Sequence, residues 1–281
     1  MKRMITLALF ALFAMPAVAL ADPGTAADRV NAAEACRAQR EAMGPAAFKA
    51  TYGTNHNGQN AFGRCVSRQA HAQRAARHEA AQQCNAERKD AEFAVTHGGK
   101  TFEQYYGGGR KGAMASCIAQ KAQALSTQGS EHTVNAAKAC SAERAALGAR
   151  DFGLLHGTAP KRANAFGRCV SQHERANRAD EQNAAEQCRA EQSDLTFPAS
   201  HGGKTFADFY GTNADDSNAF GKCVSTKAKA AADERKAARI KAAKICKAER
   251  AADPVAFRNR YGTGPKKSNA FGRCVSQHAK G

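Results

Sequence analysis

The chain of 281 residues has a formal net charge of +17 at pH 7, no tryptophan, and a hydrophobic content of 43% that is mostly alanine. Because alanine side chains bury little surface, this composition excludes a single large hydrophobic core. The excess of lysine and arginine is typical of proteins that contact anionic partners or need a well-solvated surface.

The N-terminal residues have the features of a bacterial secretory signal. Lys2 and Arg3 precede a short apolar run over residues 4–15, and Ala19-Leu20-Ala21 forms a small-x-small cleavage site. We therefore predict a signal peptide over residues 1–21 and a secreted or periplasmic protein. The apolar run is too short to cross a bilayer of about 30 Å, and no later stretch is apolar enough, so we expect no transmembrane segment after cleavage. An uncleaved anchor is the alternative.

One eight-residue motif organises the rest of the chain. Asn269-Ala270-Phe271-Gly272-Arg273-Cys274-Val275-Ser276 recurs with few changes, and a degraded copy has Met114 in place of the phenylalanine. The copies span residues 60–67, 112–119, 164–171, 218–225 and 269–276. A second cysteine lies upstream of each copy, so the chain is an array of five two-cysteine units. We place the units at residues 22–74, 75–128, 129–178, 179–231 and 232–281, of which the second and fourth are a longer type.

The ten cysteines of an exported chain indicate disulfides, and the repeat suggests one disulfide within each unit. The predicted pairs are Cys36–Cys65, Cys84–Cys117, Cys140–Cys169, Cys188–Cys223 and Cys246–Cys274. Metal binding is the rival use of paired cysteines, but zinc sites usually contain Cys-x-x-Cys or Cys/His knuckles, and this sequence has neither. We therefore expect no metal and no cofactor.

Each unit is predicted to begin with a helix and a short aromatic turn. Residues 28–43 are rich in good helix formers, Thr25 provides a capping-box-like start, and Gly44 ends the helix, as Gly148 does in the third unit. The aromatic residues that follow are four apart and therefore share one helical face. They are Phe48 and Tyr52, Phe102 and Tyr106, Phe152 and His156, Phe206 and Tyr210, and Phe257 and Tyr261.

The motif is predicted to begin the second helix of each unit, with Asn60 as the N-cap and with Phe62 and Cys65 on one face. Each disulfide would then lie just below the tip of a helical hairpin. No proline interrupts residues 60–89, so the second helix should continue into the next unit, whereas Gln128-Gly129-Ser130 is a candidate break. The predicted fold is all-α, an elongated zigzag array of five disulfide-stapled helical hairpins joined by long Ala-rich helices. A compact bundle is the alternative.

The large apolar residues gather inside the units. All phenylalanines after the signal peptide lie between the two cysteines of a predicted pair. This predicts five small cores, each too small to be stable without its cross-link. Closing a loop of about 30 residues should stabilise each unit by roughly 3–4 kcal/mol in the chain-entropy model.

Two repeated motifs invite a functional interpretation but have a simpler structural one. The glutamate three residues after the first cysteine, such as Glu143, is expected to accept hydrogen bonds from the unpaired N–H groups of the partner helix. A catalytic carboxylate would need a partner acid or base, and none recurs. His-Gly-Gly-Lys-Thr, at His97 and His201, lacks the first glycine and the strand of a Walker phosphate-binding loop. Thr101 and Thr205 more simply cap the aromatic helices.

Positive charge is concentrated near the C-terminus. Residues 227–281 contain fifteen Lys or Arg and four Asp or Glu, whereas residues 22–226 carry a net charge of only +4. A basic helix there would attract anionic surfaces by Coulomb attraction and counterion release. The candidate polyanion-binding residues are Lys227, Lys229, Arg235, Lys236, Arg239, Lys241, Lys244, Lys247, Lys266 and Lys267. The alternative is that the charge only keeps an Ala-rich helix solvated.

The combination of Asn-Ala-Phe-Gly-Arg/Lys-Cys-Val-Ser with Cys-x-Ala-Glu-Arg resembles repeats in bacterial exported Ala-rich proteins of unknown function. The similarity extends over all five units. It implies an exported, repetitive protein and no particular activity.

We therefore predict a non-enzymatic exported protein that binds lipopolysaccharide, cell-wall polymer or extracellular DNA through its basic C-terminal stem. The sequence offers no base readout, so we expect no sequence-specific nucleic-acid binding. The stem also lacks the large apolar face that membrane insertion requires. The alternative is a structural or spacer protein whose hairpin tips contact envelope proteins, and an enzyme built on Glu and His near the tips is a third hypothesis.

Overall fold

The computed structural model describes residues 26–55, 57–107, 109–158, 162–213, 216 and 218–279. Across these residues the regular elements are all α-helices, which confirms the predicted all-α class. They are α1 (Ala26–Met43), α2 (Pro45–Tyr52), α3 (Ala61–Lys89), α4 (Phe93–Thr96), α5 (Phe102–Tyr106), α6 (Gly109–His156), α7 (Ala165–Ser193), α8 (Phe197–Ser200), α9 (Phe206–Tyr210), α10 (Ala219–Ala252), α11 (Pro254–Tyr261) and α12 (Ala270–His278). The predicted signal peptide and the predicted cap Thr25 lie outside the described residues.

All five predicted disulfides are present. We call the segment between the two cysteines of a unit its tip and number the tips 1 to 5 in chain order. Each tip has its own cluster of buried residues beside the disulfide. In tip 1, for example, Phe48 and Tyr52 pack against the bonded Cys36 and Cys65. The predicted small cores are therefore present.

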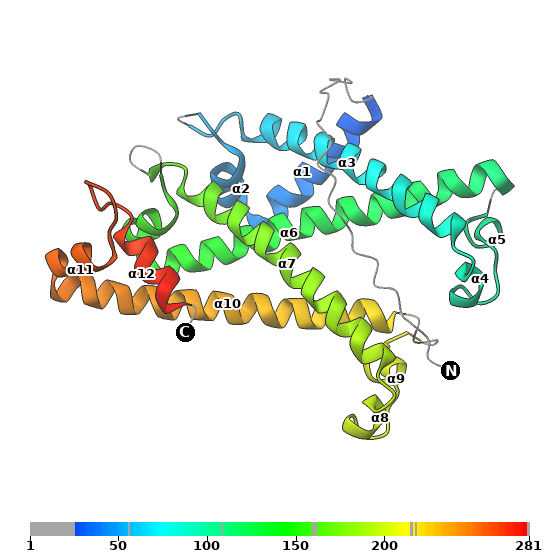
Figure 1. Ribbon diagram of the computed structural model, residues 1–281. Helices are drawn as coiled ribbons and strands as arrows, with labels where there is room; N and C mark the ends of the chain where they lie inside the picture. Colours follow the sequence, from blue (N-terminus) through cyan, green and yellow to red (C-terminus); the bar gives the residue numbers. More distant parts are fainter. Residues whose placement is uncertain are drawn as a thin grey trace.

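Four long helices carry the chain back and forth between the tips (Figure 1). Helices α3, α6, α7 and α10 each begin at one tip and end at the next, and each packs against the following one. Tips 1, 3 and 5 consequently lie at one end of the zigzag, and tips 2 and 4 lie at the other (Figure 1). The boundaries predicted between units fall inside these continuous helices, so neighbouring units share a helix.

The expected break at Gln128-Gly129-Ser130 is wrong, because α6 continues through these residues. A glycine inside a helix costs about 1 kcal/mol relative to alanine, and here the packing of α6 against α3 and α7 offsets that cost. Non-helical backbone occurs instead at Gly148, with φ of 78°, where the sequence predicts the end of the helix. The residues after Gly148 form the aromatic turn of tip 3.

Alanine fills the contacts between the long helices. Ala76 and Ala80 of α3, Ala122 of α6, Ala184 of α7 and Ala228 of α10 are all buried. Such small side chains allow close approach of the helices but bury little apolar area. The stems therefore depend on the cross-links and on polar contacts between helices.

One such polar contact joins three of the long helices. Glu174 of α7 is only 4% exposed, and it accepts hydrogen bonds from Arg68 of α3 at 2.5 Å and from Thr133 of α6. A buried carboxylate is costly unless it is paired and hydrogen-bonded. This contact therefore fixes the positions of α3, α6 and α7 relative to one another.

The odd-numbered tips pack side by side, which the prediction of separate hairpins did not include. Ala47 of tip 1 belongs to the same buried cluster as Phe152 and Phe166 of tip 3. Leu154 and Leu155 of tip 3 in turn pack against the cluster of tip 5. Tips 2 and 4 project separately (Figure 1), with α5 contacting mainly α6 and α9 contacting mainly α10.

The motif glycine allows the odd-numbered tips to approach. A Cβ atom on Gly167 of tip 3 would lie 3.5 Å from the carbonyl oxygen of Thr51 in tip 1. A Cβ atom on Gly272 of tip 5 would lie 3.7 Å from the carbonyl oxygen of Leu155 in tip 3. Both are ordinary van der Waals distances, so a small residue at this position leaves the backbones of neighbouring tips in close contact.

The motif asparagine precedes its helix as predicted, but the expected side-chain cap is wrong. Asn60 has φ of −80° and ψ of 1°, whereas a capping side chain needs an extended backbone. Its Oδ1 accepts from the Thr54 N–H at 3.1 Å, and its Nδ2 donates to Thr54 Oγ1 at 2.8 Å. The same bridge joins Asn164 to Thr158, Asn218 to Thr212 and Asn269 to Thr263. The asparagine thus closes the tip loop.

The threonine caps of the longer units are confirmed. Thr101 and Thr205 each form a capping box, with Gln104 and Asp208 respectively.

Candidate functional site: an arginine-lined pocket

A polar trio lies beside each disulfide and includes the residue three positions after the first cysteine. In tip 4, Glu191 accepts a hydrogen bond from the Tyr210 hydroxyl at 2.9 Å and forms an ion pair with Lys227 at 2.8 Å. The other trios that keep the tyrosine are Gln39, Tyr52 and Gln69 in tip 1, Glu87, Tyr106 and Lys121 in tip 2, and Glu249, Tyr261 and His278 in tip 5.

The expectation that these glutamates accept helix N–H groups is therefore wrong. The residue four positions after the second cysteine, rather than the N-terminus of its helix, faces the carboxylate. The tyrosine hydroxyl supplies the other contact, so the glutamate holds the aromatic turn in place.

Tip 3 contains the most buried trio. Glu143 is 1% exposed, His156 replaces the tyrosine, and the Nε2 atoms of His156 and His173 lie 2.8 and 3.0 Å from its carboxylate oxygens. Arg239 of α10 lies 3.3 Å away. Burial alone would raise the pKa of Glu143, but the hydrogen bonds from the two histidines and the charge of Arg239 hold that pKa well below its usual range. The carboxylate is therefore ionised and already has partners for both oxygens.

The histidines near the disulfides do not make a full set of metal ligands. Within the described residues, three groups of side chains lie close enough to share an ion, around His156, His173 and His278. Every group includes at least one cysteine that is already in a disulfide. A metal-binding cysteine must be a thiolate, so each group falls short of three ligands.

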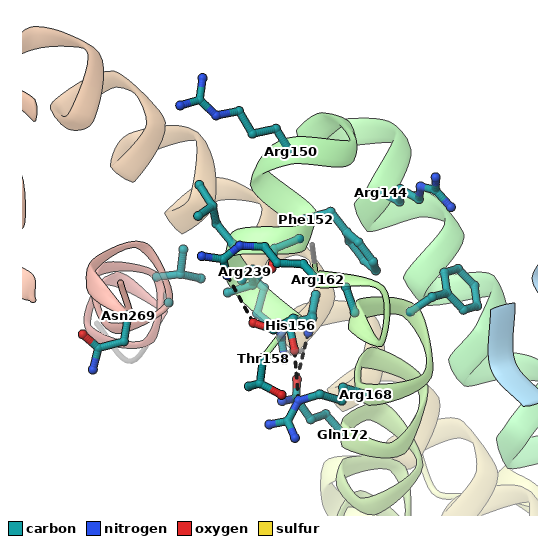
Figure 2. Close-up of a pocket in the computed structure, with 18 of the residues that line it drawn as sticks. Arg144, Arg150, Phe152, His156, Thr158, Arg162, Arg168, Gln172, Arg239 and Asn269 are labelled. Carbon is teal, nitrogen blue, oxygen red and sulfur yellow. Dashed lines mark hydrogen bonds between the residues drawn. The ribbon is translucent and has the colours of Figure 1, made fainter. Parts of the chain in front are cut away.

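A large pocket lies next to the trio of tip 3, between tips 3 and 5 (Figure 2). We call it the arginine pocket. Its volume is about 1430 Å³, and the aromatic turn of tip 3 and the starts of α7 and α12 line it together with α10. The arginines in its lining are Arg144, Arg150, Arg162, Arg168, Arg235, Arg239 and Arg273. Among the described lining residues none is Asp or Glu. Because guanidinium groups stay charged at physiological pH, the pocket attracts anions.

The arginines of the pocket differ in how far the protein neutralises them. Arg239 pairs with Glu143, and Arg235 pairs with Asp180. Arg162 and Arg168 donate only to backbone carbonyl groups among the hydrogen bonds of the described residues, so their charges are not offset. The side chains of Arg144, Arg150 and Arg273 are exposed.

The ten basic residues predicted from the sequence do not form one free strip. Lys227, Lys229, Arg235 and Arg239 form ion pairs with Glu191, Asp233, Asp180 and Glu143, and Lys267 donates a hydrogen bond to Asn259. Lys236 is half-buried, and Lys241, Lys244, Lys247 and Lys266 are exposed. The reason is that α10 is not a solvated stem, since one of its faces packs against α7 and α12.

Sequence reasoning identified Arg235 and Arg239 but missed the other arginines of the pocket. Arg144, Arg150, Arg162 and Arg168 come from the nearly neutral part of the chain, and Arg273 comes from the motif of tip 5. They meet only because tip 3 packs on tip 5. The repeated basic residue of the motif, at Arg168 and Arg273, was the available signal.

Comparison of the chain with protein-family models, curated proteins and solved structures found no match. The resemblance to bacterial exported repeat proteins therefore stays a prediction. Among the described helices we find none with the length and hydrophobicity of a membrane-crossing segment. The five disulfides fit a protein that folds in an oxidising compartment.

Proposed function

We propose that the protein is a non-enzymatic binder of anionic polymers that acts in the periplasm or after secretion. The observation that carries the proposal is the arginine pocket, which gathers seven arginines and no acidic residue among its described lining. The exposed Lys241, Lys244 and Lys247 add positive charge on the solvent side of α10. Lipopolysaccharide, anionic cell-wall polymer and extracellular DNA are the polymers that such a surface attracts.

Arginine suits this role because its planar fork donates two hydrogen bonds to one phosphate or carboxylate group. Each polymer charge that is neutralised releases a bound counterion, so the affinity falls steeply with salt. A polymer that contacts the five arginines without a carboxylate partner among the described residues should lose roughly 500-fold in affinity between 50 and 200 mM salt. Glu143, the buried carboxylate beside the pocket, has partners on both oxygens and is a poor general base.

Fluorescence titration with heparin, lipopolysaccharide and DNA at two salt concentrations tests the proposal. The variant Arg144→Gln/Arg150→Gln removes two exposed arginines of the pocket, and the matched control Arg37→Gln/Arg88→Gln removes two exposed arginines of α1 and α3. We expect the pocket variant to bind at least about tenfold more weakly and the control less than about threefold more weakly. Equal losses would mean that only net charge matters and would overturn the proposal.

The contribution of α10 is tested by substitution rather than deletion, because α10 packs against α7 and α12. The variant Lys241→Gln/Lys244→Gln/Lys247→Gln keeps those contacts, since all three side chains are exposed. We expect it to reduce the salt dependence of binding by about three counterions at most. An unchanged salt dependence would mean that the polymer contacts the arginine pocket and not these three lysines.

A spacer protein that contacts envelope proteins through its tips is the second candidate. The observation that favours it is the set of exposed side chains on the projecting tips 2 and 4, namely Val95, Tyr105, Leu195 and Phe209. The variant Tyr105→Ser/Phe209→Ser should then abolish capture of envelope proteins and leave heparin binding unchanged. Undiminished capture by this variant would rule the tips out as the contact.

A further inference from the structure

We infer that the arginine pocket recognises phosphate groups and that Arg162 and Arg168 select them; this inference rests on the proposed function. Four tips have a loop in which the motif asparagine follows the tyrosine or histidine by eight residues. In each loop, the residue two positions before the asparagine has a left-handed backbone. These residues are Gly58, Arg162, Asp216 and Lys267, with φ of 62°, 57°, 50° and 43°.

A left-handed backbone favours glycine and tolerates Asn or Asp, whereas other side chains there are strained. Gly58 in tip 1 demonstrates that the loop itself needs no side chain at this position. In tip 3 the side chain of Arg162 folds back over the turn, and its Nη1 donates to the carbonyl oxygens of Gly153 and Gly157, both at 3.1 Å. The turn thus holds a guanidinium group against the wall of the pocket. Lys267 has the same strained backbone, so the two carbonyl contacts and the place in the pocket lining, rather than the strain, distinguish Arg162.

Arg168 reaches the same turn from the start of α7. Its Nε donates to the carbonyl oxygen of His156 at 3.0 Å, so both Nη groups remain for a ligand. The carbonyl groups of His156 and Gly157 belong to consecutive residues, so both arginines are anchored to the same turn. Figure 2 shows Arg162 and Arg168 on either side of His156.

Neither arginine forms an ion pair with a carboxylate of the described residues, and the nearby Glu143 is bound to His156 and His173 instead. Two guanidinium groups that line the same pocket without a counter-charge repel each other. A bound anion with more than one negative charge would remove that repulsion. The pair therefore favours a multivalent anion over a single carboxylate.

Geometry favours phosphate among such anions. The two guanidinium groups donate hydrogen bonds to different carbonyl oxygens, so a ligand that contacts both groups must present oxygen atoms in several directions. A phosphomonoester has three terminal oxygens and a charge of about −1.5 to −2 at neutral pH, whereas a planar carboxylate fits one arginine fork. The pocket volume of about 1430 Å³ leaves room for several linked phosphate groups.

Calorimetric titration with inorganic tripolyphosphate, and with citrate as a tricarboxylate of similar size, tests the inference. Arg162→Gly introduces the residue that tip 1 has at this position, so the variant should fold, because relief of the backbone strain offsets the loss of the two hydrogen bonds to carbonyl groups. We expect it to bind tripolyphosphate at least about tenfold more weakly than wild type. Arg168→Lys keeps the charge but loses the fork, and it should weaken tripolyphosphate binding about fivefold while heparin binding changes little.

Lys267→Gly is the matched control, because it makes the same change at the same loop position of tip 5. It removes one positive charge and relieves the same backbone strain, but Lys267 does not line the pocket. We expect less than about a twofold change in affinity for tripolyphosphate. Equal weakening by Arg162→Gly and Lys267→Gly would overturn the inference.

The remaining outcomes separate the inference from the proposed function. Citrate binding as tight as tripolyphosphate binding, with heparin still bound, would overturn phosphate recognition and leave polyanion binding intact. Failure of wild type to bind heparin or tripolyphosphate in 50 mM salt would overturn both. Phosphatidylcholine vesicles that contain phosphatidic acid distinguish the source of the phosphate. Binding to them that requires Arg162 supports a lipid headgroup, and binding to tripolyphosphate alone supports a soluble polymer.

Discussion

The double variant Cys84→Ala/Cys117→Ala removes the disulfide of tip 2, and Cys140→Ala/Cys169→Ala removes that of tip 3. The sequence separations are 33 and 29 residues, so the two loops are of similar length. The chain-entropy model assigns each cross-link nearly the same stabilisation, roughly 3.7 kcal/mol. Any difference between the two variants must therefore come from packing.

Tip 2 packs almost entirely on itself. Its buried cluster consists of Cys84, Phe93, Phe102, Ala113 and Cys117. Burying a phenylalanine stabilises by at most about 3 kcal/mol, so the two rings supply about 6 kcal/mol against the entropy of ordering the loop. Loss of the disulfide therefore removes a stabilisation comparable to that supplied by the two buried rings. Tip 3 has additional packing from Ala47 of tip 1, and its own Leu154 and Leu155 pack into the cluster of tip 5.

Hydrogen–deuterium exchange with mass spectrometry reports the opening of each tip separately. In the tip 2 variant, we expect the amides of α4 and α5 to exchange up to about 500-fold faster, the equivalent of about 3.7 kcal/mol. In the tip 3 variant, residues 149–156 should stay protected while the Tm of the whole protein falls. Equal loss of protection in both tips, or unchanged protection in tip 2, would refute this reasoning.

Three further predictions concern single substitutions. The pKa of Glu143 is lowered from its ordinary value of 4.5, so its carboxylate stabilises the fold above pH 4.5, and this contribution is lost as the pH falls below that value. In Glu143→Gln, the Tm should therefore fall less steeply with decreasing pH than it does in wild type. An equally steep fall of the Tm at acid pH would contradict the role given to Glu143. Tyr106→Phe removes a 2.8 Å hydrogen bond to Glu87 and should lower the free energy of unfolding by about 1 kcal/mol in a urea titration. An unchanged free energy of unfolding would mean that the trio does not stabilise the tip. Gly53→Ala places a Cβ 2.7 Å from loop backbone and should destabilise by about 2 kcal/mol, whereas Gly63→Ala meets no atom within 4 Å and should stabilise by up to about 1 kcal/mol; the reverse order of Tm would disprove the loop geometry.

Features that depend on short stretches of chain could be predicted from the sequence. The regular cysteine spacing was enough to pair all ten cysteines and to place each disulfide near a tip. Thr101 and Thr205 were recognised as caps because a capping box involves only residues three apart. Gly148 was recognised as a helix end for the same reason.

Features that depend on backbone angles or on contacts between units could not be predicted. A loop-closing asparagine and a capping asparagine have the same sequence signature, and only the φ and ψ of Asn60 distinguish them. The arginine pocket exists because Leu154 and Leu155 pack on tip 5, which brings Arg150 and Arg273 into the lining of one pocket. The polar trios had a weak signal, since the residue four after the second cysteine is Gln, Lys or His in every unit.

Arginine modification by phenylglyoxal, with and without saturating polyphosphate and with mass-spectrometric readout, locates a bound polymer directly. Arg144, Arg150 and Arg273 are exposed around the arginine pocket and should be protected when polyphosphate binds. Arg37 and Arg88 are equally exposed on α1 and α3 and should react at the same rate in both samples. Binding at this site would be contradicted if polyphosphate protected Arg37 and Arg88 as strongly as the pocket arginines. It would also be contradicted if the pocket arginines reacted at the same rate with and without polyphosphate.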